Sequence, residues 1–285
     1  MASSPIITLT SDFGLQDAYV GAMKGVILGI NPAASIVDIS HAVRPQAIEQ
    51  GAFLLGTAWP YFPGQTIHVA VVDPGVGTQR RALALRTPVA TFVGPDNGVL
   101  SAALPEEVRE AVSGYGGPAP IELPEGYRAV SLANEAYFRQ PVSTTFHGRD
   151  VFAPAAAHLS LGVPLEELGE PVEAVLVLPP FRARRQADGS LRGRVIHIDI
   201  FGNLVTDIRC EDLPERVEVE IGGRRIEGVS SAYTQGEGLL AVTGSSGYLE
   251  VAVRSSSAAR ALAGDIGMPV QVRPYKGSGS SRTGI

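Results

Sequence analysis

The sequence has few of the residues that form disulfides, bind metals as clusters or cross membranes. It contains a single cysteine, Cys210, among 285 residues, which excludes an intrachain disulfide and a metal site built from several cysteines. No apolar run approaches the ~18–20 residues of a membrane span. The N-terminus also lacks the basic and apolar regions of a secretory signal. These absences predict a reduced, cytoplasmic protein with no membrane segment.

Positive charge is also scarce. Lysine and arginine number 23 against 29 acidic residues, for a net charge of −6, so a surface that binds nucleic acid is not expected.

Hydrophobic residues make up 45% of the chain and charged residues 18%, which excludes a disordered protein. The 33 glycines and 21 prolines predict many tight turns. The length suits about two domains at ~150 residues each.

The first half of the chain alternates short apolar runs with segments of helical periodicity. The apolar runs are typical of buried strands and lie at 6–12, 34–39, 66–73 and 89–94. The helical segments lie at 18–30 and 47–61. Because strands alternate with helices, we expect residues 1–178 to form a three-layer α/β domain with a largely parallel sheet.

The periodicity drops to two after a linker-like segment that begins near residue 178. Two hairpins are predicted, one turned at Gly222 and Gly223 and one turned by the Gly-Ser-Ser-Gly segment at 244–247. We therefore expect a small β-barrel domain over residues 191–275. The remaining residues, 276–285, are small and polar, and we expect a disordered tail there.

Three predicted strands are followed by acidic turns, which contain Asp12, Asp73 and Asp96. Ligands of open α/β sheets bind beyond the carboxyl ends of the strands, so these carboxylates are candidates for a binding edge. Asp and Gly are also ordinary turn residues, so a purely structural explanation stays open. The chain has no Gly-x-Gly-x-x-Gly or Walker motif. The acidic turns instead favour a cationic or hydroxyl-rich ligand, and we expect neither a cofactor nor a metal.

Two further segments carry candidate residues. His147 lies at the junction between a loop and a predicted helix, where a helix N-terminus disfavours its protonated form. Asp199, Phe201 and Asn203 interrupt an alternating strand, and such a set can stack on a heterocycle and bind its edge. The alternatives are a structural histidine and a simple strand bend. His41 and His158 lie in weaker contexts, and for them we favour a structural role.

Six motifs, taken in order, resemble one family closely. They are TSDFG at 10–14, VDPGVGT at 72–78, GPDNG at 94–98, FHGRD at 146–150, DIFGN at 199–203 and GSSGYLE at 244–250. In this order they resemble the S-adenosyl-L-methionine (SAM) hydrolases, or SAM hydroxide adenosyltransferases (DUF62). That family is related to the SAM-dependent fluorinase and chlorinase. The resemblance extends over residues 5–272.

The resemblance implies an N-terminal α/β domain, a C-terminal β-barrel and a homotrimer. SAM would bind between the N-terminal domain of one subunit and the C-terminal domain of the next. It also implies an Asp–Arg–His set that the halogenases lack, here Asp73, Arg80 and His147. Arg81 follows Arg80 directly, so a shift of one residue is the alternative assignment.

The resemblance also assigns the substrate contacts. Asp12 would hold the ribose hydroxyls, Asp17 would face the methionine end, and Asp199 would pair with the methionine ammonium. The other implied contacts are apolar or stacking walls from Phe146, Phe201 and Tyr233, the methionine carboxylate at Ser245 and Ser246, and the adenine edge at Asn203, Val253 and Ser255. The chain departs from its relatives at Gln46, where the halogenases have tryptophan, and at Arg254, where many have asparagine.

The implied reaction is an in-line attack of water or hydroxide on C5′ of SAM, giving adenosine and L-methionine without a cofactor. Water would be held by the Asp–Arg–His set, and the sequence leaves open which residue takes its proton. One alternative is a SAM-dependent halogenase, against which the charge of Asp73 argues. The other is a SAM- or adenosine-binding sensor that does not turn over. Another adenosyl compound as substrate also stays open.

Overall fold

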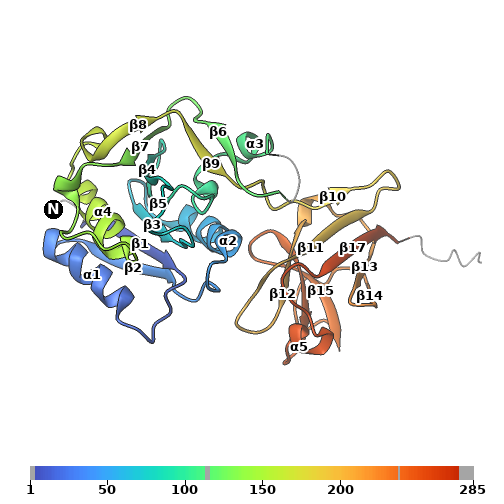
Figure 1. Ribbon diagram of the computed structural model, residues 1–285. Coiled ribbons are helices and arrows are strands. Elements are labelled where there is room, and N and C mark those ends of the chain that lie inside the picture. Colours follow the sequence, from blue (N-terminus) through green and yellow to red (C-terminus); the bar gives the residue numbers. More distant parts are fainter. Residues whose placement is uncertain (1–3, 113–115, 237, 276–285) are drawn as a thin grey trace, which may run out of the picture. The chain divides into compact units, whose positions relative to one another are not determined.

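The computed structural model describes residues 4–112, 116–236 and 238–275. The chain divides into two compact units, Met1–Pro180 and Phe181–Ile285 (Figure 1). The tail predicted at 276–285 lies outside the described residues. None of the helices within the described ranges is long and apolar enough to cross a membrane.

The first unit is built on a seven-stranded mixed sheet. In pairing order its strands are β2 (Ser35–Ser40), β1 (Ile6–Ser11), β3 (Ile67–Val71), β5 (Thr91–Pro95), β4 (Ala82–Arg86), β7 (Arg128–Leu132) and β8 (Gly169–Val172). The first four strands are parallel, and the next three continue the sheet in antiparallel fashion. The parallel strands are those predicted from the sequence, whereas the antiparallel extension was not predicted.

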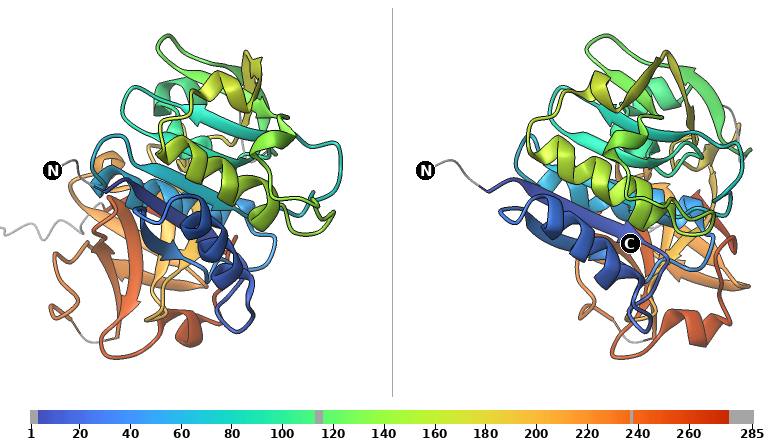
Figure 2. Two further views of the ribbon diagram at one scale, coloured as in Figure 1. Left: turned by 90° about the vertical axis from the view of Figure 1, so that its left-hand side faces the viewer. Right: turned by 60° about the vertical axis from the view of Figure 1, so that its left-hand side comes forward.

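Helices cover both faces of this sheet. On one face, α1 (Tyr19–Ile30) and α4 (Ala153–Ser160) lie side by side and bury Met23 and Ile27 against Ile7 and Leu9 of β1 (Figure 2). On the other face, α2 (Ile48–Ala58) buries Leu55. The predicted three-layer α/β arrangement is therefore confirmed.

Short elements complete this unit. A π-helical turn, η4 (Gly148–Phe152), leads directly into α4. A two-stranded antiparallel pair joins β6 (Ala119–Glu122) to β9 (Ala174–Val177). The remaining helical pieces are η1 (Trp59–Tyr61), η2 (Ser101–Ala103), α3 (Glu106–Arg109), η3 (Glu135–Tyr137) and η5 (Leu165–Leu168).

The second unit is an antiparallel, nearly closed barrel-like sheet of eight strands. In pairing order the strands are β14 (Arg224–Glu227), β13 (Val217–Ile221), β17 (Pro269–Pro274), β11 (Leu191–Ile198), β12 (Leu204–Arg209), β16 (Tyr248–Val253) and β15 (Leu239–Thr243), with β10 (Arg184–Arg185) paired to β11. Both predicted hairpins, β13–β14 and β15–β16, are confirmed. Two short helices, η6 (Cys210–Asp212) and α5 (Ala258–Leu262), complete the unit.

The parallel strands of the first unit place three loops at one edge of the sheet. Because β1, β3 and β5 run in the same direction, their carboxyl ends lie together. The turns that follow them carry Asp12, Asp73 and Asp96. This edge is where open α/β sheets bind their ligands.

Candidate active site

The structure brings His147 together with Asp73 and Arg80, although it lies 67 residues beyond Arg80 in the sequence. Arg80 Nε lies 2.9 Å and 3.0 Å from the two carboxylate oxygens of Asp73. Its Nη2 atom donates to Asp73 as well, and lies 2.8 Å from Nδ1 of His147. Only 5% of the Asp73 side chain and 11% of the Arg80 side chain are exposed. The guanidinium thus links the carboxylate to the imidazole in a nearly buried cluster.

Close backbone packing makes this cluster possible. Gly77 has a φ of 77°, and a side chain there would begin 2.4 Å from the carbonyl oxygen of Thr144. Only glycine fits a position with both a left-handed backbone and such a close approach. The loop after β3 therefore lies directly against the segment that precedes His147. On its other side, the Arg80 guanidinium lies 5.3 Å from the centre of the Phe152 ring, a cation–π distance.

The hydrogen bond from Arg80 determines the tautomer of His147. A guanidinium can only donate, so Nδ1 of His147 accepts and the proton of the neutral ring lies on Nε2. Burial and the Arg80 cation lower the pKa of His147 below its usual 6.5, although Asp73 and Asp150 act in the opposite direction. The site therefore holds a neutral imidazole that presents one N–H donor.

Arg81 takes a different partner. Its Nε donates to Oδ2 of the buried Asp96 at 2.8 Å, and the other oxygen of Asp96 accepts from the backbone N–H of Leu176 at 2.7 Å. The register that places Arg80 in the cluster is therefore the one that the geometry supports. Asp96 thus links the turn after β5 to Leu176 of β9. Of the three carboxylates at this edge, Asp12 and Asp73 therefore remain available to a ligand.

Asp12 lies at the same edge, directly after β1. Its Oδ2 atom accepts the backbone N–H of Gln46 at 2.8 Å. Gln46 has a φ of 66°, a conformation that non-glycine residues rarely adopt. This contact fixes the direction of the Asp12 carboxylate. Asp17 lies on an exposed turn before α1, and no contact joins it to the cluster within the described residues.

An aromatic group lies next to the cluster. Phe146 packs edge-on against Phe13 and Tyr19, with ring centres 5.7 Å and 5.0 Å away. A side chain at Gly148 would meet the Phe13 ring at 3.0 Å, so Phe13 lies directly beside the turn that follows His147. Phe146 was predicted from the sequence, whereas Phe13 and Tyr19 were not. Phe13 could have been found, because it stands within the TSDFG motif.

In the second unit, Asp199 and Asn203 form a closed local network. One oxygen of Asp199 accepts the backbone N–H groups of Phe201 and Asn203 at 2.9 Å and 2.8 Å. The other accepts the side-chain amide of Asn203 at 2.8 Å. The bend leaves Phe201 75% exposed and Ile200 93% exposed. Two large apolar side chains thus project from a rigid turn.

Tyr233 contacts a carboxylate that was not predicted from the sequence. Its hydroxyl donates to Oε2 of Glu250 at 2.8 Å. Burial raises the pKa of Glu250, and burial together with this hydrogen bond raises that of Tyr233 to about 12. A side chain at Gly244 would meet the Glu250 carboxylate at 2.1 Å, which explains the glycine. The other predicted residues of this unit lie on exposed or half-buried backbone: Ser245, Ser246, Val253 and Ser255.

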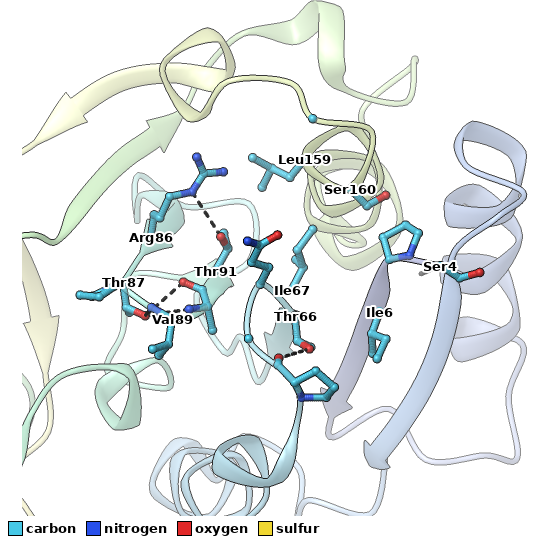
Figure 3. Close-up of a pocket in the computed structure, with 17 residues that line it drawn as sticks. Ser4, Ile6, Thr66, Ile67, Arg86, Thr87, Val89, Thr91, Leu159 and Ser160 are labelled. Atoms are coloured by element: carbon cyan, nitrogen blue, oxygen red, sulfur yellow. Dashed lines mark hydrogen bonds between the residues drawn. The ribbon is translucent and has the colours of Figure 1, made fainter. Parts of the chain in front are cut away.

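A cavity of about 650 Å³ lies elsewhere in the first unit (Figure 3). It is lined by the first residues of β1, β3 and β5, which is the edge opposite to the Asp73 cluster. Among the described residues that line it, the charged side chain is Arg86, whose Nε lies 3.4 Å from Thr91 Oγ1. None of the predicted site residues lines this cavity, so the candidate site is the cluster rather than this hollow.

Comparison with known proteins agrees with the motifs. Residues 7–169 match the SAM hydroxide adenosyltransferase N-terminal domain, and residues 193–271 match the C-terminal domain. The chain belongs to the SAM hydroxide adenosyltransferase family. It is 39% identical to an (R)-S-adenosyl-L-methionine hydrolase of Salinispora arenicola, over 92% of this chain and 95% of that protein. An enzyme of the same name from Thermus thermophilus is 42% identical, over 92% and 97%.

A more distant relative and a solved structure complete the comparison. A fluorinase of Actinoplanes is 30% identical over 74% of each chain. A crystal structure of an uncharacterized conserved protein from Thermotoga maritima superposes with a TM-score of 0.79 at 34% identity, covering 93% of this chain and 99% of that one. The hydrolases are thus more similar to this chain than the fluorinase is.

Proposed function

We propose that this SAM hydroxide adenosyltransferase hydrolyses (R)-S-adenosyl-L-methionine to adenosine and L-methionine. The observation that carries the proposal is the buried contact of Arg80 with both Asp73 and His147. The relatives named as hydrolases at 39–42% identity support it.

The chemistry of a sulfonium explains why such a small site suffices. Sulfur leaves as a neutral thioether when C5′ is attacked, so no acid has to protonate the leaving group. The protein must hold a water oxygen ~3–3.5 Å from C5′, in line with the C–S bond. The Nε2–H of His147 and the carboxylate of Asp73 are one donor and one acceptor that can orient that water.

The arrangement favours positioning over strong base catalysis. Nδ1 of His147 is occupied by Arg80, and both carboxylate oxygens of Asp73 already accept hydrogen bonds from Arg80. As the C–O bond forms, however, the attacking water becomes an oxonium and loses its proton readily. Asp73 is the member of the cluster that keeps free lone pairs, so we assign it the proton. The water then needs little activation before attack.

The remaining contacts follow the resemblance. Asp12 accepts the two ribose hydroxyls, for which a carboxylate is well suited, and Phe146 forms an apolar wall. Asp199 pairs with the methionine ammonium. The remaining roles are assigned to Asp17 and Ser245 with Ser246 at the methionine end, to Phe201 and Tyr233 as walls, and to Asn203, Val253 and Ser255 at the adenine edge.

We also propose a homotrimer with the site at the subunit boundary. Asp12 and Asp199 belong to different units but are assigned to one ligand. Heterologous contacts around a three-fold axis would create three equivalent sites. The exposed Ile200 and Phe201 support a partner at that turn, because a neighbouring subunit would bury them. The single cysteine supports a cytoplasmic location.

One incubation tests the reaction. Purified protein is given SAM with and without chloride or fluoride, and the products are separated by chromatography. Adenosine and methionine, independent of halide, are the expected products. A 5′-halo-adenosine that requires halide would identify a halogenase instead, and binding of SAM without any product would identify a sensor. Methylthioadenosine with homoserine lactone would contradict attack at C5′.

A further inference from the structure

A continuous chain of hydrogen bonds runs beside the candidate site, from Ser11 through His41 to Asp38 and Lys24. Ser11 Oγ lies 2.7 Å from His41 Nδ1, and His41 Nε2 lies 3.1 Å from Asp38 Oδ1. Lys24 Nζ lies 2.6 Å from the other oxygen of Asp38. His41 is 5% exposed and Ser11 is 1% exposed. The sequence alone gave no role to this histidine beyond a structural one.

This Ser–His–Asp chain is not a nucleophilic triad. A catalytic serine must expose its oxygen to a substrate, whereas Ser11 is buried. The ring is also reversed relative to serine proteases, where Nε2 faces the serine and Nδ1 faces the aspartate. Its role must therefore lie in what it holds in place.

The chain holds the turn that carries Asp12 and Phe13. Ser11 Oγ accepts the backbone N–H of Phe13 at 3.3 Å, and the carbonyl oxygen of His41 accepts the backbone N–H of Gly14 at 2.8 Å. His41 thus contacts the turn at both ends, through its ring and through its backbone. Asp12 lies between these two anchors.

The directions of these bonds form a consistent set. Because the charged carboxylate of Asp38 can only accept, Nε2 of His41 carries the ring proton and donates it to Asp38. Nδ1 then accepts the hydrogen of the Ser11 hydroxyl. Burial raises the pKa of Asp38, but the hydrogen bonds of Lys24 and His41 lower it overall, so the terminal acceptor stays charged. Each group therefore fixes the orientation of the next.

We propose that His41 is a positioning residue, which holds Asp12 and Phe13 in the conformation that binds the nucleoside end of the substrate. This inference rests on the proposed function, in which Asp12 holds the ribose hydroxyls. His41 touches neither the Asp73 cluster nor the reacting atoms. Its loss should therefore reduce affinity rather than the rate of the chemical step.

The test uses His41→Gln and Ser11→Ala in the full-length protein. Each variant should raise the KM for SAM and the Kd for adenosine, measured by calorimetry, by about tenfold or more, while kcat at saturating SAM stays within about threefold. Removing His41 in an Asp12→Ala background should add much less, because both changes act through the same contact.

Thr8→Val is the matched control. Thr8 Oγ1 lies 2.8 Å from Nδ1 of the buried His68, so this variant removes the same type of bond from the same strand, three residues earlier. It should lower the melting temperature but leave KM and Kd unchanged. If Thr8→Val raises the Kd as much as Ser11→Ala does, the effect is general destabilisation and the inference is wrong.

A measurement on the unmodified protein covers the case in which a variant fails to fold. Nitrogen-15 NMR should find the ring proton of His41 on Nε2, with Nδ1 accepting a hydrogen bond. A proton on Nδ1 would contradict the bond order described above. If wild type hydrolyses SAM and His41→Gln binds adenosine as wild type does, only the inference fails. If wild type binds neither SAM nor adenosine, the proposed function fails and the inference with it.

Discussion

Nη2 of Arg80 lies 2.8 Å from Nδ1 of His147, so a permanent cation occupies one nitrogen of the imidazole. This relationship gives the ring a single tautomer and opposes its protonation. His147 therefore differs from the histidine of a hydrolytic triad, whose second nitrogen faces a carboxylate and which becomes charged during the reaction.

The first prediction concerns the dependence of kcat on pH. Burial and Arg80 lower the pKa of His147 from 6.5, so the neutral ring persists above that value. Activity should be constant through the neutral range and fall only as the pH drops through the lowered pKa, below 6.5. Below the pKa of His147, a proton on Nδ1 would face the Arg80 guanidinium and break the hydrogen bond between the two residues. An activity loss centred above pH 6.5 in steady-state rates would contradict this assignment.

The second prediction separates chemistry from binding. Asp73→Ala and His147→Ala should each lower kcat by about 10²-fold or more, which is the lower range for general-base and positioning effects. The Kd for SAM should stay within about tenfold, because these groups act on the water. Asp12→Ala is the comparison, since it should raise the Kd through loss of a charged acceptor for two hydroxyls. Near-native kcat in both cluster variants would place the water elsewhere.

The third prediction concerns the shared site. Asp12→Ala and Asp199→Ala proteins are each expected to be weak enzymes. Mixing them in equal amounts, followed by dissociation and reassembly, should restore about one quarter of the wild-type sites if each site combines two neighbouring subunits. Each variant treated alone provides the control. No recovery from mixed trimers, or a fully active monomer in light scattering, would show that one chain contains the whole site.

The fourth prediction concerns stability in acid. Burial lowers the pKa of His68 to about 4, and its ring stacks on Phe92 with centres 5.0 Å apart. The free energy of folding that depends on this neutral ring is fully present above pH 6.5 and is lost as the pH falls from 6.5 towards 4. The loss by pH 4.5 should be about 2–3 kcal/mol. Urea unfolding at pH 7 and pH 4.5 should show a smaller loss for His68→Phe, and an equal loss would contradict it.

Several of the elements predicted from the sequence have a regular burial pattern. The parallel strands β1, β3 and β5 are apolar runs because they are covered on both faces, and the barrel hairpins alternate because one face is buried. Five strands of the first unit were missed: β4, β6, β7, β8 and β9. The strands β6, β8 and β9 are short and partly exposed, and β8 includes a glycine and a proline, so neither periodicity is visible in them. The strands β4 and β7 are largely buried, so burial alone does not explain which strands the sequence revealed.

The sequence predicted most of the residues of the candidate site but not the contacts between them. The motif order pointed to Asp73 and His147, and the geometry then distinguished Arg80 from Arg81, because that choice depends on where Asp96 lies. Glu250 was missed because a carboxylate in an alternating strand normally faces water. It is buried here because Tyr233 donates to it and because Gly244 leaves room for it.

The spacing of its residues along the chain also determines how the cluster assembles during folding. Asp73 and Arg80 are seven residues apart, in the loop between β3 and β4, whereas the contact of Arg80 with His147 closes a loop of 67 residues. The first contact costs little conformational entropy, while the second forms only when η4 and α4 dock on the sheet. Local opening of α4 should therefore inactivate the enzyme while the Asp73–Arg80 pair stays intact. On heating, activity should be lost in step with hydrogen exchange in α4, ahead of global unfolding.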